Sequence, residues 1–194
     1  MALAYVELSL TLDTPFLPGS VDPNRVDPDW PLRPSEVKGI WRWWARALVA
    51  GALFERGLLH GRLSPNVVKT PTGEEVSCIS RIVGLNLGLG YAGERNSRAS
   101  CFKIIINPDD QQFSLPQPAG VNLANRLQRI KLLTLGKRSI EYVSRASIRL
   151  IIDEHAPCKL DRASIEASLS ALALALRYSC FGKGGRRGLG CFSI

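Results

Sequence analysis

Glycine is concentrated near the carboxyl end of the chain, in the stretch FGKGGRRGLGCFSI. Five of the nine residues from Gly182 to Gly190 are glycine. Because glycine loses more backbone freedom on folding than any other residue, such a cluster marks a chain path that side chains would obstruct. Capping a helix would require one or two of these glycines, not five. Since a long apolar stretch precedes the segment, we expect a tight loop between a helix and a last strand.

Cationic residues stand among these glycines. Successive glycines let backbone N–H groups converge on one concavity that binds phosphate oxygens, and Lys and Arg add charge-assisted hydrogen bonds. The chain has 25 Lys and Arg against 17 Asp and Glu, a formal net charge of +8, which favours a polyanionic partner such as nucleic acid. We therefore predict a phosphate-binding loop formed by Lys183, Gly184, Gly185, Arg186, Arg187 and Gly188.

The amino-terminal part predicts a strand and then a long helix. Residues 5–12 alternate between polar and apolar side chains, which is typical of a strand. In RPSEVKGIWRWWARALVAGALFERG, Ser35 is the expected N-cap and Gly57 the expected end of a helix. Between strand and helix lies a proline-rich loop, whose Asp22, Asp27 and Asp29 are either cation ligands or, more simply, turn residues.

Two sets of side chains share this predicted helix. Lys38, Arg42 and Arg46 follow one another at a spacing of four and form a basic stripe away from the apolar side. Trp43 lies off the main apolar arc, so both base stacking and core packing are open to it.

The rest of the chain completes a mixed pattern. We expect a hairpin across PTGEE, strands over 78–83, 101–106 and 144–152, a short helix over 121–133, a helix capped by Asp161 that ends near Tyr178, and a last strand in LGCFSI. This order predicts an α+β, ferredoxin-like βαββαβ (RRM-like) fold, with an antiparallel sheet and two helices on one face. We expect one domain over 1–194, with a loop-rich insertion at about 63–140.

Signals for cofactors and covalent catalysis are weak. GLGYAG, from Gly88, is followed by a loop and a strand instead of the helix that a dinucleotide site needs; we interpret it as a loop that could touch RNA through Arg95 and Arg98. His60 and His155 lack a nucleophile pattern and are interpreted as structural or solvated. The five cysteines include no C-x-x-C pair, so we expect buried free thiols, with disulfides as the alternative in a hyperthermophile. We predict no metal, nucleotide or other cofactor.

Two motifs together resemble a known family. RPSEVKGIWRWWARAL and FGKGGRRGLGCF resemble the helix start and the glycine-rich loop of the RAMP superfamily of CRISPR RNA-binding proteins, most closely the first subunit of the Cmr (type III-B) effector complex, as a single-domain or amino-terminal part. Val83 departs from the family's L-F-G pattern. The residues that fit the first motif and are expected to bind RNA are Arg33, Ser35, Lys38, Arg42 and Arg46.

The resemblance implies a noncatalytic subunit of a type III CRISPR ribonucleoprotein that grips guide or target RNA in antiviral defence. Its expected partners are single-stranded RNA and the other subunits of the effector complex. The alternatives are an endoribonuclease of the same superfamily, for guide processing or target cleavage, and a basic scaffold that binds only proteins. The amino end has no basic leader region and the apolar helix is short, so we expect a soluble cytoplasmic protein without a membrane partner.

Overall fold

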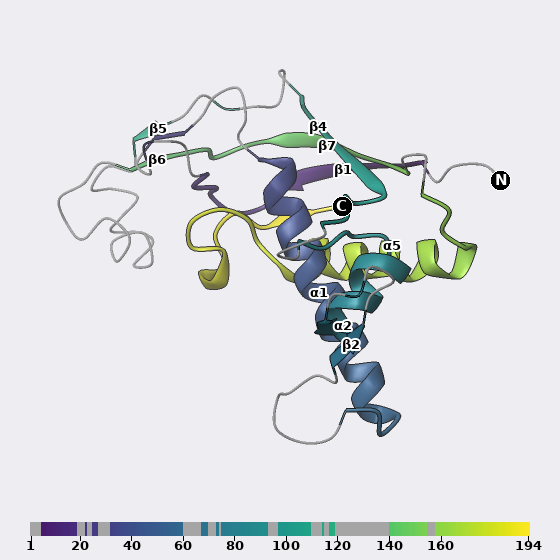
Figure 1. Ribbon diagram of the computed structural model, residues 1–194. Coiled ribbons are helices and arrows are strands. Elements are labelled where there is room, and N and C mark those ends of the chain that lie inside the picture. Colours follow the sequence, from purple (N-terminus) through teal and green to yellow (C-terminus); the bar gives the residue numbers. More distant parts are fainter. Residues whose placement is uncertain are drawn as a thin grey trace. The chain divides into compact units, whose positions relative to one another are not determined.

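The computed structural model describes residues 5–18, 22, 25–26, 32–59, 67–69, 73, 75–92, 97–109, 114, 117–118, 140–154 and 158–194 (Figure 1). The strands are β1 (Tyr5–Leu12), β2 (Val67–Lys69), β3 (Glu75–Ser77), β4 (Phe102–Pro108), β5 (Gln117–Pro118), β6 (Glu141–Tyr142), β7 (Ser147–Glu154) and β8 (Phe192–Ser193). The helices are α1 (Pro34–Glu55), α2 (Cys78–Arg81), a π-helical turn (Ile82–Asn86), α5 (Arg162–Tyr178) and a 3-10 turn (Gly185–Arg187).

Four strands form the main sheet, in the order β4-β7-β1-β8. The first and last strands are antiparallel neighbours, with Thr11 opposite Ser193 and Leu12 opposite Phe192. In β7 every second residue is buried, as expected for a strand with one face on a core. The fold is therefore mixed α+β with an antiparallel sheet, and the strand predicted over residues 5–12 is confirmed. β4, which lies within the range predicted as an insertion, belongs to this sheet.

The chain divides into two compact units. Unit 1 comprises Met1–Val6, Gly39–Ile104 and Ile152–Ala175, and unit 2 comprises Glu7–Lys38, Ile105–Ile151 and Leu176–Ile194.

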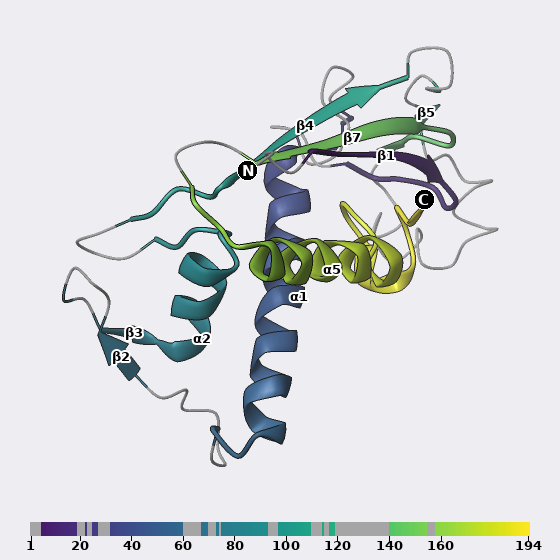
Figure 2. The ribbon, with the colours of Figure 1, turned by 90° about the vertical axis from the view of Figure 1, so that its right-hand side faces the viewer.

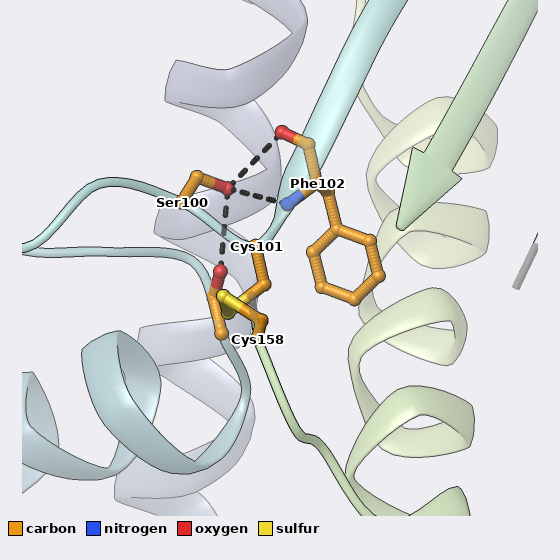
Figure 3. The surroundings of a disulfide bond; sticks show 5 residues. Ser100, Cys101, Phe102 and Cys158 are labelled. Carbon is orange, nitrogen blue, oxygen red and sulfur yellow. Dashed lines mark hydrogen bonds between the residues drawn. A yellow bond between two sulfur atoms is a disulfide. The ribbon is translucent and has the colours of Figure 1, made fainter. Parts of the chain in front are cut away.

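Unit 1 is organised around the fully buried Trp41 of α1. The indole Nε1 donates a hydrogen bond of 2.7 Å to the carbonyl of Ser168 on α5, where the two helices cross (Figure 2). Its ring packs on Phe102, with centroids 5.1 Å apart. A disulfide joins Cys101 to Cys158 beside this packing, and Ser100 Oγ accepts a hydrogen bond from the N–H of Phe102 (Figure 3).

Unit 2 has an aromatic core. The ring of Phe192 in β8 meets those of Phe16 and Phe181 edge to face, at centroid distances of 5.6 and 5.8 Å. Phe16 follows β1, and Phe181 follows α5. These contacts, together with the pairing of β8 on β1, hold the segment after α5 against the start of the chain.

Several predicted elements are confirmed. The hairpin across PTGEE forms, with Lys69 opposite Glu75. Asp161 Oδ1 accepts a hydrogen bond of 2.7 Å from the N–H of Ser164 and so caps α5. The short helix predicted over 121–133 lies outside the described residues.

The strand predicted over 78–83 is wrong, because the chain there forms α2 and then a π-helical turn. Ser77 caps α2: its Oγ accepts a hydrogen bond of 3.0 Å from the N–H of Ser80. This cap outweighs the strand preference of the apolar residues that follow it.

The prediction of free thiols is wrong for four of the five cysteines. Cys101 pairs with Cys158 and Cys180 pairs with Cys191, whereas Cys78 is free. Folding brings each pair within bonding distance across 57 and 11 residues, respectively, a proximity that spacing alone does not reveal.

Candidate nucleic-acid interface

Residues 182–190, here called the glycine loop, leave the end of α5 and return to β8. The loop is closed at its neck by an antiparallel bridge between Cys180 and Cys191 and by a hydrogen bond of 2.8 Å from Phe181 N–H to the carbonyl of Gly190. It is also fastened to the segment after β1: Lys183 N–H donates to the carbonyl of Leu17 at 2.8 Å, and Gly190 N–H to that of Pro15 at 2.9 Å. The loop is therefore a fixed turn.

Close packing explains why this turn needs glycine. A Cβ at Gly190 would collide with the carbonyl oxygen of Phe181, and the residue has φ 69°, a left-handed conformation that side chains disfavour. Gly185 has no such φ, but a Cβ there would collide with the carbonyl oxygen of Cys180. Both glycines let the chain lie directly on neighbouring backbone.

The backbone N–H groups of the loop are largely used inside the protein. Besides the two bonds to the segment after β1, Arg187 N–H donates to the carbonyl of Gly184 at 2.7 Å and Gly188 N–H to that of Gly185 at 3.1 Å. Leu189 N–H also donates to Gly184, at 3.3 Å. These N–H groups stabilise the turn, and the predicted binding of phosphate by the loop stays a prediction.

The turn holds three cationic side chains in one short segment. Arg186 and Arg187 are exposed, and Lys183 is half-buried. Partial burial lowers the pKa of Lys183, while the nearby carboxylate of Asp22 acts in the opposite direction. Asp22, which is also 3.8 Å from Arg25 Nε, thus lies beside the glycine loop in unit 2. The structure thus brings the predicted loop residues together on one hydrogen-bonded turn.

The start of α1 differs from the prediction at one residue. The helix begins at Pro34, and the carbonyl of Arg33 accepts hydrogen bonds from Glu36 N–H (2.9 Å) and Val37 N–H (3.3 Å), so Arg33 is the N-cap and Ser35 is not. Proline suits the first helical position because it has no N–H to satisfy. Glu36 Oε2 in turn accepts a hydrogen bond of 3.3 Å from Arg33 N–H.

This helix start carries a half-buried carboxylate. Burial raises the pKa of Glu36, although its hydrogen bond and its proximity to Arg33 favour the charged form. Ser35 is exposed and Lys38 half-buried. Arg33, Ser35 and Lys38 belong to unit 2, as the glycine loop does.

The two arginines further along α1 belong to unit 1. Arg42 is half-buried, and its Nε donates a hydrogen bond of 2.8 Å to the carbonyl of Leu89, within the glycine-rich GLGYAG segment. Burial, and to a lesser extent the charge of Arg46, lowers the pKa of Arg42. Arg46 is exposed. Arg42 thus has a structural contact in addition to the RNA contact predicted for it.

The structure describes only some of the other residues that the sequence analysis singled out. Tyr91 of the GLGYAG segment forms a backbone pair with Arg98, and the next described element along the chain is the strand β4. His60, His155, Asp27, Asp29 and Arg95 lie outside the described residues. In the part of the chain that the structure describes, no group of three or more His, Cys, Asp or Glu is arranged to hold a metal ion, and no helix is long and apolar enough to cross a membrane.

The Cys180–Cys191 disulfide is the feature of this loop that the sequence analysis missed. The two cysteines stand just outside the first and last glycines, at positions that a hairpin-like return would bring together. That placement at both ends of the glycine-rich segment was the available signal.

Two features define the class of protein to which this chain belongs: an antiparallel α+β fold and a basic glycine loop before the last strand. The chain belongs to the RAMP superfamily, whose family model matches residues 9–193. The resemblance drawn from the two motifs is thereby confirmed.

Comparison with solved structures identifies individual proteins whose folds are similar to that of this chain. The chain is similar to Cmr1 from Pyrococcus furiosus in its apo form, with 18% identity, a TM-score of 0.58, and coverage of 100% of this chain and 49% of that chain. It is also similar to chains in two cryo-EM structures of the type III-B Cmr-beta. One, bound to cognate target RNA, gives 16% identity, a TM-score of 0.67, and coverage of 99% and 54%.

The other, bound to cognate target RNA and AMPPnP in the presence of ssDNA, gives 15% identity, a TM-score of 0.65, and coverage of 97% and 54%. The chain thus spans about half the length of the chains it matches. A search of curated proteins gives no match.

Proposed function

We propose that this protein is a noncatalytic RNA-binding subunit of a type III CRISPR effector complex of the Cmr kind, acting in the cytoplasm in antiviral defence. The observation that carries the proposal is the glycine loop, a hydrogen-bonded turn that presents Lys183, Arg186 and Arg187 from a fixed backbone. Preformed cationic groups bind phosphates with little loss of entropy, because the loop is already ordered. Its ligand is the backbone of single-stranded guide or target RNA.

The fold and the comparisons support this proposal. The sheet order β4-β7-β1-β8, with α1 after β1 and α5 after β7, is the order expected of a ferredoxin-like βαββαβ domain. Two of the similar solved structures are complexes bound to cognate target RNA. The remaining partners in our proposal are the other subunits of such a complex.

A ribonuclease of the same superfamily is the second candidate, and one observation favours it. Asp22 is close enough to the glycine loop to influence the pKa of Lys183, so a carboxylate lies beside the proposed phosphate contacts. A carboxylate in that position is suited to binding a divalent cation for phosphodiester cleavage.

RNA binding and cleavage assays separate the two candidates. Labelled single-stranded RNA is incubated with the full chain, with and without magnesium, and analysed on native and denaturing gels. We expect a retarded complex with intact RNA in both conditions. Cleavage that needs magnesium and is abolished by Asp22→Ala would replace our proposal with the ribonuclease, and absence of a complex at physiological salt would favour a protein-binding scaffold.

A further inference from the structure

A tryptophan on α1 is left on the surface of unit 1. The side chain of Trp43 is 61% exposed, whereas Trp41 in the same helix is fully buried. An indole ring has a large apolar surface, which is usually covered in a folded protein. Core packing, one of the two roles open to Trp43 from the sequence, is therefore excluded.

The ring of Trp43 is held on one side by its neighbour. It meets the half-buried ring of Trp44 edge to face, with centroids 5.4 Å apart and an interplanar angle of 81°. Aromatic pairs in this geometry contribute more than burial of their area alone. The contact restrains the exposed indole and so lowers the entropy lost when a flat ligand stacks on it.

A glycine lies one helical turn before the ring. Helical side chains lean toward the amino terminus, so a side chain at position 39 would lie next to Trp43. Gly39 has none, and a Cβ built there meets no heavy atom within 4 Å. Glycine inside a helix is about 0.5–1 kcal/mol less favourable than alanine. Close packing therefore does not require Gly39, and the glycine leaves the helix surface beside the indole open.

The surroundings of the ring are cationic. Arg46 is exposed and lies one turn after Trp43, on a neighbouring strip of the helix surface. Arg42 precedes Trp43 directly, and its charge is close enough to that of Arg46 for the two to repel each other. An aromatic ring among arginines is typical of single-stranded nucleic-acid sites, in which bases stack on the ring and the cations bind phosphates.

We propose that Trp43 is a stacking platform for one unpaired base of single-stranded RNA, with Arg46 contacting an adjoining phosphate and Gly39 leaving the approach to the ring open. This inference rests on the proposed RNA-binding function and adds a base contact to its phosphate contacts. Stacking on a ring does not depend on which base is present, because every base offers a flat π face. The site therefore has little sequence preference.

The test compares an oligouridine with an abasic oligomer of the same length, which keeps the phosphates and lacks the bases. Binding of each to the full chain is measured by fluorescence anisotropy for the parent, Trp43→Ala and Trp43→Phe. Stacking is worth about 1–3 kcal/mol per base, so we expect Trp43→Ala to weaken oligouridine binding by about 5- to 150-fold and Trp43→Phe to weaken it less. Binding of the abasic oligomer should not change.

Two further variants control for helix stability and for loss of an exposed aromatic. Phe54→Ala removes another exposed ring from α1, 66% exposed, and should leave both affinities unchanged. Gly39→Leu fills the space beside the indole while improving helix propensity. It should therefore weaken oligouridine binding without lowering the melting temperature, and Gly39→Ala should have a smaller effect.

Three outcomes would overturn the inference: Trp43→Ala binding oligouridine as the parent does, equal losses for oligouridine and the abasic oligomer, or unchanged RNA affinity with impaired binding to other subunits of the complex. The last would identify a protein contact.

If the parent binds neither oligomer, the proposed function fails together with this inference. If the parent binds both and only the glycine-loop variant Lys183→Ala/Arg186→Ala/Arg187→Ala is impaired, the proposed function stands and the stacking platform does not.

Discussion

Cys180 and Cys191 form a disulfide at the neck of the glycine loop, with their Cα atoms 4.1 Å apart. The same two residues form an isolated antiparallel bridge, so a covalent and a backbone contact close the loop at one point. All of the cationic residues of the loop lie between them. The conformation that presents these charges is thus tied to the oxidised state of one cysteine pair.

We predict that removing this disulfide affects both stability and RNA binding. Closing a loop of 11 residues stabilises a protein by about 3 kcal/mol through the entropy of the unfolded chain, so Cys180→Ser/Cys191→Ser should lower the free energy of unfolding by about that amount. RNA affinity should also fall, because binding must then order the loop. Denaturant titration and anisotropy measure the two effects.

The second disulfide is the matched control for that measurement. Cys101 and Cys158 both lie in unit 1, and Cys101→Ser/Cys158→Ser removes a link across 57 residues, for which the expected loss of stability is about 4 kcal/mol. RNA binding through the glycine loop should persist in this variant while it remains folded. Equal RNA affinities of the parent and Cys180→Ser/Cys191→Ser would contradict a role for the loop's closure.

Substitution of Gly190 should destabilise the fold. Gly190→Ala places a Cβ against the carbonyl oxygen of Phe181 at a left-handed φ, which costs about 1–3 kcal/mol for strain alone. Gly51→Ala is the control, because a Cβ on this helical glycine meets nothing within 4 Å and should stabilise the protein by about 0.5–1 kcal/mol. Thermal melts of both variants check the prediction, which fails if they shift in the same direction.

Alanine substitutions of Arg42 and Arg46 should have different effects, the first on stability and the second on RNA binding. Arg42→Ala removes the donor to the carbonyl of Leu89, and hydrogen bonds to charged groups contribute about 1.5–3 kcal/mol, so its melting temperature should fall. Arg46→Ala removes an exposed charge and should keep the parent's melting temperature while weakening RNA binding. A drop in melting temperature for Arg46→Ala as large as that for Arg42→Ala would show that this division is wrong.

Glu36 gives a prediction for pH. Because burial raises the pKa of Glu36, the folded state holds a proton more tightly than the unfolded state does. This contribution to stability is fully present below the ordinary pKa of glutamate and is lost as pH rises through the raised value. Relative to Glu36→Gln, the parent should therefore gain stability on acidification. Denaturation midpoints of both proteins across that range test the sign, and a parent that loses stability relative to the variant would refute it.

The sequence predicts those elements of the fold that local patterns determine. β1 follows from alternation, and α5 from the cap at Asp161, whose side chain reaches the N–H of Ser164. By contrast, the apolar residues after Cys78 have the composition of a strand but form a helix, because Ser77 caps it and the chain then turns through Ile82–Asn86. Local composition could not decide this case; the cap was the overlooked signal.

For the candidate site, the cationic residues could be predicted from the sequence, but the hydrogen bonds that hold them in place could not. Lys183, Arg186 and Arg187 are evident from the sequence, but the hydrogen bond from Lys183 N–H to Leu17 joins residues far apart in the chain. The same holds for the contact of Arg42 with Leu89, which gives a predicted binding residue a structural role. Such long-range contacts depend on how the chain packs, and residue spacing does not contain them.

The salt dependence of RNA binding is the most direct test of the glycine loop as a phosphate-binding site. On single strands the logarithm of affinity falls with the logarithm of salt concentration at a slope of about −0.7 per phosphate neutralised. Lys183→Ala/Arg186→Ala/Arg187→Ala should reduce the steepness of that slope by up to about 2, weaken binding, and keep the parent's melting temperature.

Arg56→Ala/Lys69→Ala/Lys159→Ala removes the same charge from exposed positions in unit 1 and serves as the control. We predict that the control keeps a slope close to the parent's while the glycine-loop variant does not. Equal slopes and equal affinities for the parent and a fully folded glycine-loop variant would contradict the account.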